Sequence, residues 1–145
     1  MVRGPLPQAE FEAIYAKVPR LTVELVVRGG RGVYLTRRDS GPCAGLWHLP
    51  GGTVRYGEPL VDAVTRVGGA ELGVEVVAHE LLGYLEYPSH LAAGIDWPVG
   101  IAFSCEASAD LAVGDDRGWF AHSPGPMHDE QRSFLVALGV PVGES

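Results

Sequence analysis

A diglycine turn followed by a stretch with charged side chains is the part of this sequence best suited to chemistry. Gly51 and Gly52 precede Asp62 and Arg66, which lie one helical turn apart, and Glu71 follows. Glycines let a backbone approach a ligand closely and leave a carbonyl oxygen free to face a cation. A carboxylate opposite that carbonyl suits Mg²⁺, which prefers oxygen ligands and bridges to phosphates. The pattern equally fits an amphipathic helix with a solvated Asp62–Arg66 pair.

Two consecutive glycines, Gly68 and Gly69, interrupt this helical stretch. Each glycine costs about 1 kcal/mol relative to alanine inside a helix. A close approach of another backbone segment would explain the pair, and so would drift without function.

Apolar residues at helical or alternating spacing predict the elements that must position this segment. The helices are expected at residues 8–17, 59–72 and 128–138, and the strands at 21–28, 33–37, 81–87, 99–107 and 117–121. The turn Gly29-Gly30-Arg31-Gly32 joins the first two strands as a hairpin. Pro59 suits the first turn of the central helix and Gly73 its C-terminal cap. Strands with helices before, between and after them favour a mixed sheet sandwiched by helices.

Composition limits the class of protein. The chain has 145 residues, which suits one domain spanning 1–145. A formal charge of −7 disfavours nucleic acid as a partner. The two cysteines are too few for a disulfide scaffold and are expected to be reduced thiols. Because no apolar run reaches the length of a membrane span, we expect no membrane association and a cytoplasmic location.

Residues 52–74 carry the resemblance to a known family. Gly52 is followed by Glu58 after five residues and by Arg66 after seven more, and then by Glu71 and Gly73-Val74. This pattern resembles the Nudix box, and Trp47 to Gly51 resemble the segment that usually precedes it. The resemblance implies the Nudix fold, an α/β/α sandwich of the α+β class with a mixed sheet. It also implies a metal-dependent hydrolase of nucleoside diphosphates linked to another moiety.

The box departs from the usual pattern at positions that hold metal in typical members. Val67 and Ala70 replace two glutamates, and Gly68 replaces a bulky aliphatic residue. The resemblance therefore implies one Mg²⁺ per site rather than two or three.

A subgroup, the GDP-mannose mannosyl hydrolases, is similar beyond the box. The shared features are Pro19, Thr22 with Glu24, Arg31-Gly32, and the box ending Ala70-Glu71-Leu72-Gly73. The similarity implies a nucleotide-sugar substrate such as GDP-mannose, attack of water at the sugar's anomeric carbon, and a homodimer.

Site residues follow from the same resemblance. Gly51, through its carbonyl, and Glu71 would hold Mg²⁺, and Glu71 and Arg66 would be catalytic. Arg38 would bind the diphosphate, and Glu24 would contact the substrate. His48 is also expected to contact the substrate, because it lies beside the diglycine loop in the sequence. Glu58 is expected to order the loop or to balance Arg66.

The general base is not assigned by the sequence. The subgroup has a Gln-His pair before Asp-Asp-x-x-Trp, whereas this chain has Val113-Gly114 before Asp115-Asp116. Replacement candidates are His48, His90 and Asp115. His128 is expected to have a satisfied surface role, and Tyr87 either stacks on a base or packs. The alternative function is a Nudix-fold module that binds nucleotides but has lost hydrolysis.

Overall fold

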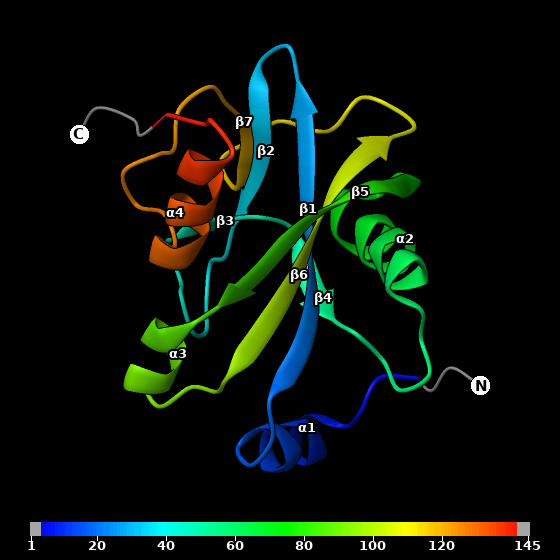
Figure 1. Ribbon diagram of the computed structural model, residues 1–145, viewed down its shortest axis with the longest axis vertical. Coiled ribbons are helices and arrows are strands. Elements are labelled where there is room, and N and C mark those ends of the chain that lie inside the picture. The colour runs from blue at the N-terminus through cyan, green and yellow to red at the C-terminus, as the bar shows by residue number, and fades with distance from the viewer. Residues whose placement is uncertain (1–3, 142–145) are drawn as a thin grey trace.

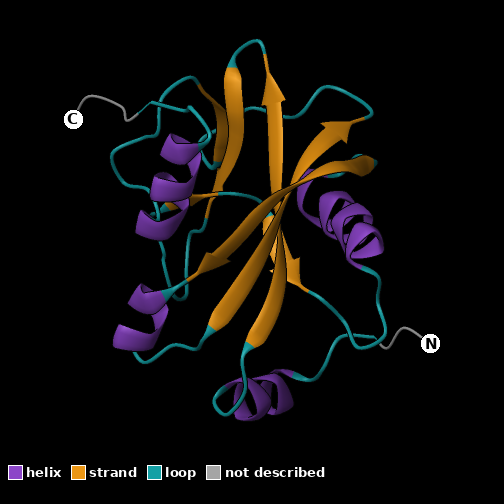
Figure 2. Cartoon of the chain, viewed as in Figure 1, coloured by secondary structure: helices purple, strands orange, loops and turns teal. Residues whose placement is uncertain are grey.

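The computed structural model describes residues 4–141 and places a mixed sheet between helices (Figures 1 and 2). The central strand β1 (Arg20–Gly29) pairs antiparallel with β2 (Gly32–Arg37) and β4 (Gly51–Thr53) and parallel with β6 (Pro98–Ala107). Beyond these, β5 (Val76–Glu86) pairs with β6, while β3 (Trp47–His48) and β7 (Arg117–Phe120) pair with β2.

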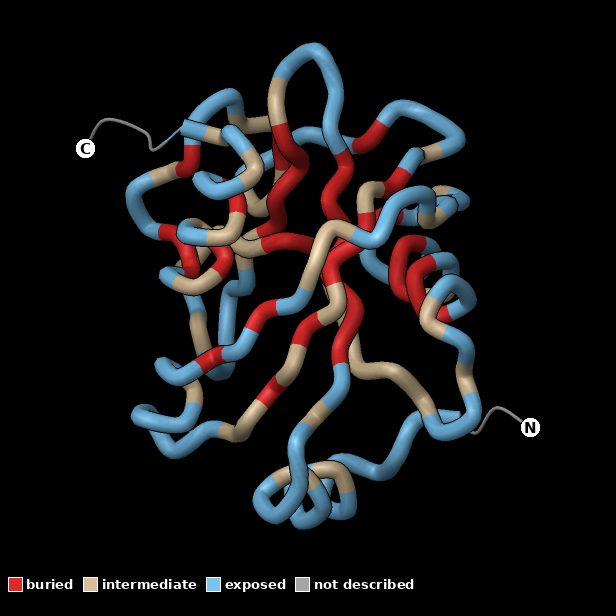
Figure 3. The backbone as a smooth tube through the Cα atoms, viewed as in Figure 1, coloured by how far each residue is buried: buried red, intermediate tan, exposed pale blue. Residues whose placement is uncertain are grey.

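Strand β1 is buried on both faces because a helix covers each side of the sheet. Its odd residues Val23, Leu25 and Val27 pack into a core with α2 (Leu60–Leu72). Val26 packs into a second core with α4 (Asp129–Ala137). Successive side chains of a strand point to opposite faces, so Thr22 and Glu24 share the α4 side with Val26. Figure 3 shows the buried segments gathered along these central strands.

The predicted sandwich and the α+β class are confirmed, and the expected helices and strands all occur, with small shifts at their ends except at the start of β5. The strand predicted over 81–87 is longer in the structure, where it is β5 and begins at Val76. Polar His79 and Glu80 interrupt its apolar pattern, and bulges between Ala78 and Gly83 break the two-residue period. The short strands β3 and β4 and the five-residue α3 (Pro88–Ala92) were not predicted.

The packing of helix α2 against β5 explains one of the two glycines inside the helix. A Cβ on Gly68 would lie 2.6 Å from Cβ of Val76, so the first strand residue of β5 requires a glycine there. A Cβ on Gly69 would meet no atom of the described residues within 4 Å, and nothing in the structure explains that glycine. Gly73 caps the helix in the left-handed conformation, as expected, with φ of 71°. Pro59 is the N-cap residue instead of a member of the first turn.

Helices α1 (Gln8–Tyr15) and α3 lie beyond the ends of the sheet strands rather than against a sheet face (Figure 1). Neither helix contains a buried residue. Together with the 38–46 loop they lie around one cavity. No helix within residues 4–141 is long and apolar enough to cross a membrane.

Candidate active site

A cavity of about 690 Å³ opens where β1 and β4 meet helices α1, α3 and α4. Its walls carry arginines, carboxylates, histidines and a thiol, drawn from segments far apart in the sequence. A large concave site with convergent polar groups is the expected form of a small-molecule site.

Glu24 is the most strongly perturbed acid in this cavity. Its side chain leaves β1 on the α4 side and is only 6% exposed. Burial raises the pKa of Glu24 to about 7, although hydrogen bonds from Tyr87 and Thr22 partly oppose the shift. A carboxyl group with a pKa near neutrality can accept and release a proton under physiological conditions.

A chain of hydrogen bonds fixes the orientation of this carboxylate. Tyr87 donates from its hydroxyl to Oε1 of Glu24 at 2.8 Å, and Thr22 donates to the same oxygen at 3.0 Å. Gln131 donates to the Tyr87 hydroxyl at 3.2 Å and accepts a hydrogen bond from the Leu49 backbone N–H at 2.6 Å. Both hydroxyl donors therefore engage Oε1.

Glycines make the space that Glu24 occupies. A Cβ on Gly51 would lie 2.5 Å from Oε2, and one on Gly100 would lie 2.7 Å from Oε1. Gly51 is the residue directly opposite Glu24 in the β1–β4 ladder. The diglycine turn singled out in the sequence thus lies against the buried carboxylate, and Oε2 is the oxygen that faces it.

Most of the predicted site residues line this one cavity. Gly51 and Gly52 are joined there by the exposed Glu71 from α2, and by Glu24, Arg38 and His48. Arg38 makes no ion pair within residues 4–141, so its charge is available to an anion.

His48 is held in one orientation at the cavity wall. Its Nδ1 lies 2.9 Å from the Leu49 carbonyl oxygen, which can only accept, so Nδ1 carries the proton. Burial lowers the pKa of His48, so the ring is neutral near pH 7.

Arg66 lies apart from the cavity-lining residues described above. Its guanidinium pairs with Glu58 at 2.8 Å and donates to the Thr53 carbonyl oxygen at 2.8 Å. Glu58 also accepts a hydrogen bond from the Arg55 backbone N–H. The hydrogen bond from Arg66, despite some opposing burial, holds the pKa of Glu58 below its ordinary value. This pair ties the loop after β4 to α2, as expected for Glu58, and Arg66 reaches the site through Thr53.

The position of one missing box carboxylate is filled by packing. Val67 is 2% exposed, and a Cβ on Gly52 would lie 2.9 Å from its Cγ2. An apolar side chain thus closes the space between α2 and the diglycine turn, where a glutamate would offer oxygen ligands.

The acidic turn Asp115-Asp116 lies outside the cavity lining. The Asp115 and Asp116 carbonyl oxygens accept hydrogen bonds from Arg37, and the Asp116 carboxylate pairs with Arg117 at 3.3 Å. Val113, which stands where the subgroup has a site residue, is 65% exposed. This turn therefore organises β2 and β7 rather than the cavity.

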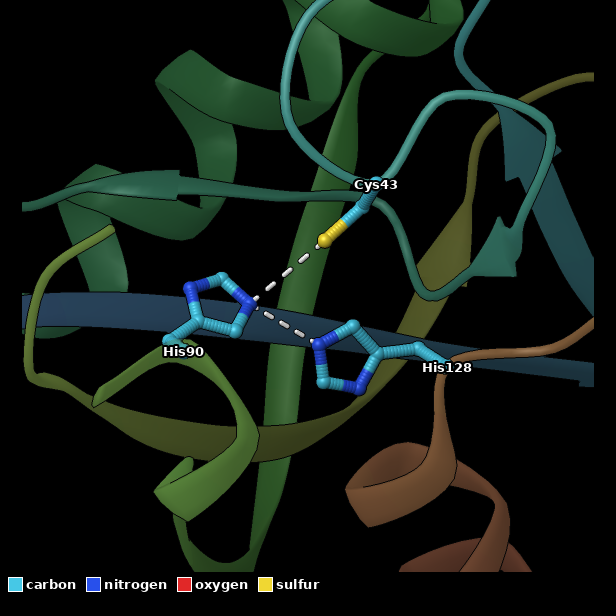
Figure 4. A group of neighbouring side chains, drawn as sticks. All are labelled: Cys43, His90 and His128. Carbon is cyan, nitrogen blue, oxygen red and sulfur yellow. Dashed lines mark hydrogen bonds between the residues drawn. The ribbon is translucent and has the colours of Figure 1, made fainter. Parts of the chain in front are cut away.

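The surface role predicted for His128 is wrong, because the side chain is buried. It is 5% exposed at the N-cap of α4, and burial lowers its pKa. Its Nε2 lies 2.9 Å from Nε2 of His90, and Cys43 Sγ lies 3.7 Å from the same His90 atom (Figure 4). Both cysteines are free thiols, as expected.

Asp96 fixes the other side of His90. Its carboxylate lies 2.9 Å from Nδ1 of His90 and 2.8 Å from Nε of Arg20. Burial opposes ionisation of Asp96, yet the hydrogen bonds from these two partners hold its pKa below the ordinary value. The His90 ring is therefore oriented by an ionised carboxylate.

Sequence reasoning missed Gln131, Cys43 and His128 as members of the site. Gln131 lies on the buried face of α4, where a polar residue in the apolar pattern was the available signal. Tyr87 follows β5, and its sequence context predicts only stacking or packing. The contacts that bring these residues to the cavity join separate helices, strands and loops, and the spacing of residues along the sequence does not predict such contacts.

Comparison with known proteins agrees on one family. A model described as the NUDIX domain matches residues 18–134. The low-salt glycan biosynthesis protein Agl8 of Haloferax volcanii is 42% identical over 107 residues, which cover 72% of this chain and 69% of Agl8. An ADP-ribose pyrophosphatase of Methanocaldococcus jannaschii is 29% identical over 99 residues, or 68% of this chain and 57% of that protein. The MutT NUDIX hydrolase structure from Burkholderia pseudomallei has a TM-score of 0.71 at 28% identity, covering 83% of this chain and 98% of that one.

Proposed function

The chain belongs to the NUDIX family, and we propose that it is a Mg²⁺-dependent hydrolase of nucleotide sugars such as GDP-mannose. The observation that carries this proposal is the meeting of Glu24, the Gly51-Gly52 turn, Glu71 and Arg38 in one cavity. The name of the Haloferax relative, a glycan biosynthesis protein, is in keeping with a sugar-containing substrate.

The residues at the turn suit magnesium chemically. The Gly51 carbonyl and the Glu71 carboxylate would hold the ion, and both are the hard oxygen donors that Mg²⁺ prefers. Glu71 is exposed, which leaves room for the waters that Mg²⁺ retains. With Val67 in place of a carboxylate, the donor set suits one ion. When bound, Mg²⁺ would neutralise charge on the diphosphate leaving group.

Glu24 is proposed as the proton acceptor. Its Oε2 faces the diglycine turn, while both hydroxyl donors engage Oε1. In the proposed reaction, a water molecule gives a proton to Oε2 as its oxygen bonds to the substrate and the bond to the leaving group breaks. Arg38 would bind the departing diphosphate, and His48 would contact the substrate from the cavity wall.

Phosphorus NMR of the purified protein with GDP-mannose, other nucleotide sugars and Mg²⁺ tests this function. We expect GDP and free sugar, which indicate attack at the anomeric carbon. GMP and sugar phosphate would keep the hydrolase assignment and move the attack to phosphorus. If every substrate remained intact, the proposed activity would be wrong.

The second candidate is a nucleotide-binding module without hydrolysis. The side chain of Val67 against the diglycine turn and the exposed Val113 favour it, because neither can bind metal or accept a proton. Under this alternative, a nucleotide sugar would raise the melting temperature through binding linkage with no turnover.

A further inference from the structure

Three potential metal ligands from separate parts of the chain converge at the cavity wall. Cys43 lies in the loop between β2 and β3, His90 in α3, and His128 at the N-cap of α4. One ligand atom from each lies within 4.8 Å of the other two, and Figure 4 shows the side chains pointing toward one another. None of the three belongs to the diglycine turn or α2, so the cluster is separate from the proposed magnesium ligands.

Two of the three distances between ligand atoms are close to those of a tetrahedral metal centre. Zn–N bonds of about 2.0 Å and Zn–S bonds of about 2.3 Å at tetrahedral angles place ligand nitrogens about 3.3 Å apart and a sulfur about 3.5 Å from a nitrogen. The two Nε2 atoms lie 2.9 Å apart, and the Cys43 sulfur lies 3.7 Å from Nε2 of His90. Shifts of a few tenths of an ångström would bring these two distances to the tetrahedral values.

The surroundings supply the support that metal-bound histidines need. A ligating histidine usually donates its other ring N–H to a carboxylate or carbonyl, which fixes the ring. Asp96 accepts in this way from Nδ1 of His90 at 2.9 Å. Nδ1 of His128 is buried and has no hydrogen-bond partner among residues 4–141, and Oε2 of Glu130 lies 3.9 Å away, so a small side-chain movement would bring the two into contact.

The backbone at Cys43 is also unusual. Cys43 has a φ of +64°, the left-handed region that non-glycine residues rarely adopt, and it is alone in this among non-glycine residues of the described part of the chain. This conformation belongs to the turn from which the sulfur reaches the two imidazoles. Strained backbone conformations cluster at functional sites, and a ligand role for the sulfur would account for this one.

We propose that Cys43, His90 and His128 bind a transition-metal ion of the Zn²⁺ class. Thiolate and imidazole ligands select such ions over Mg²⁺, which prefers oxygen. Because all three residues line the cavity, the fourth coordination position is open to water or to an anionic oxygen of a bound ligand. The site does not depend on the proposed nucleotide-sugar hydrolysis.

Titration of the reduced, untagged protein with Co²⁺ tests the site directly. We expect one equivalent to bind, with the visible bands of tetrahedral cobalt and a near-ultraviolet band from thiolate-to-cobalt charge transfer. Zn²⁺ should abolish both signals at equal concentration, and a large excess of Mg²⁺ should leave them unchanged.

Matched variants assign the ligands. Cys43→Ser should remove the charge-transfer band, and His128→Ala should weaken Co²⁺ binding by more than about 100-fold. Asp96→Asn should weaken it by about 10–100-fold through His90. Cys105→Ala and His79→Ala are the controls, because Cys105 is buried in the α2-side core and His79 pairs with Glu106. Both should bind as wild type does.

The metal-free variants should show wild-type circular dichroism, which separates loss of a ligand from loss of the fold. Absence of Co²⁺ binding in the wild type would overturn the proposal, as would a charge-transfer band that survives Cys43→Ser. Because cobalt absorption needs no substrate, an inactive hydrolase with a normal cobalt spectrum would refute the proposed function alone.

Discussion

Tyr87 and Glu24 are 63 residues apart in the sequence, and a 2.8 Å hydrogen bond joins the tyrosine hydroxyl to Oε1 of the carboxylate. Tyr87 is 2% exposed and Glu24 is 6% exposed, so the bond forms where water competes little. This hydrogen bond stabilises the ionised form of Glu24 and so opposes the rise in pKa that burial causes. The hydrogen bond therefore helps to set the pH at which Glu24 itself becomes ionised.

Replacing Tyr87 with phenylalanine should move the acidic limb of the pH–rate profile upward. In the wild type we expect kcat/KM to fall as pH drops through about 7, where Glu24 becomes protonated. Loss of the hydroxyl donor raises the pKa of Glu24 further, since that bond favours the ionised form. At pH 6, kcat/KM should fall roughly tenfold below wild type, and at pH 9 it should nearly match.

Tyr84→Phe is the control for this prediction, because Tyr84 is 66% exposed and does not line the cavity that holds Glu24. Its pH profile should equal that of the wild type. An unshifted profile in Tyr87→Phe would show that Glu24 does not control the limb.

Glu24→Gln should change how stability depends on pH. The pKa of Glu24 is raised in the folded state, so its contribution to stability is full below pH 4.5 and is lost as pH rises through about 7. Relative to wild type, the glutamine variant should therefore gain on the order of 3 kcal/mol in unfolding free energy between pH 4.5 and pH 8. Urea unfolding of both proteins at several pH values measures this difference, and a constant difference would contradict the shifted pKa.

The two glycines of α2 should respond to alanine in opposite directions. Gly68→Ala places a methyl group 2.6 Å from Cβ of Val76, which should destabilise the fold by about 1–3 kcal/mol. Gly69→Ala meets nothing and should stabilise the helix by up to about 1 kcal/mol. Thermal and urea unfolding provide the comparison, and equal effects of the two substitutions would refute the packing at Gly68.

Substitutions of Arg38, which lines the cavity, and of Arg66, which pairs with Glu58, should separate effects on substrate binding from effects on stability. Arg38→Ala should raise KM for a nucleotide sugar by about tenfold or more with little change in melting temperature, because Arg38 makes no ion pair within residues 4–141. Arg66→Ala should lower the melting temperature, since it leaves the 4% exposed carboxylate of Glu58 without its partner. Melting temperatures and steady-state kinetics on both variants test this, and a stable Arg66→Ala enzyme with a raised KM would reverse the assignment.

The fold was largely predictable from the sequence because its signals are local. The apolar stripe of α2, the left-handed Gly73 and the Gly29–Gly32 turn each report their own conformation through a few neighbouring residues. Strand β5 was underestimated at its start, since bulges place polar His79 and Glu80 in an irregular register. The two-residue β3 and three-residue β4 are too short to produce a period, and only pairing with β2 and β1 makes them strands.

The site was predictable mainly where a local motif marks it. The diglycine turn and the box identified Gly51 and Glu71, and the strand similarity identified Glu24, and all three line the cavity. Gln131 and His128 enter because α4 packs on the same sheet face as Glu24. Such contacts between elements depend on the tertiary arrangement, and the sequence around a polar helix residue does not identify its partner.

Hydrolysis of a nucleotide sugar by wild type and Glu71→Gln, followed at saturating Mg²⁺ and pH 8, tests the central claim most directly. Glu71 is exposed on α2, so the substitution should leave the melting temperature unchanged. We predict turnover by the wild type and a loss of at least about 100-fold in kcat for the variant, because the carboxylate that would hold the metal is gone. Equal turnover by the two proteins would contradict the proposed site.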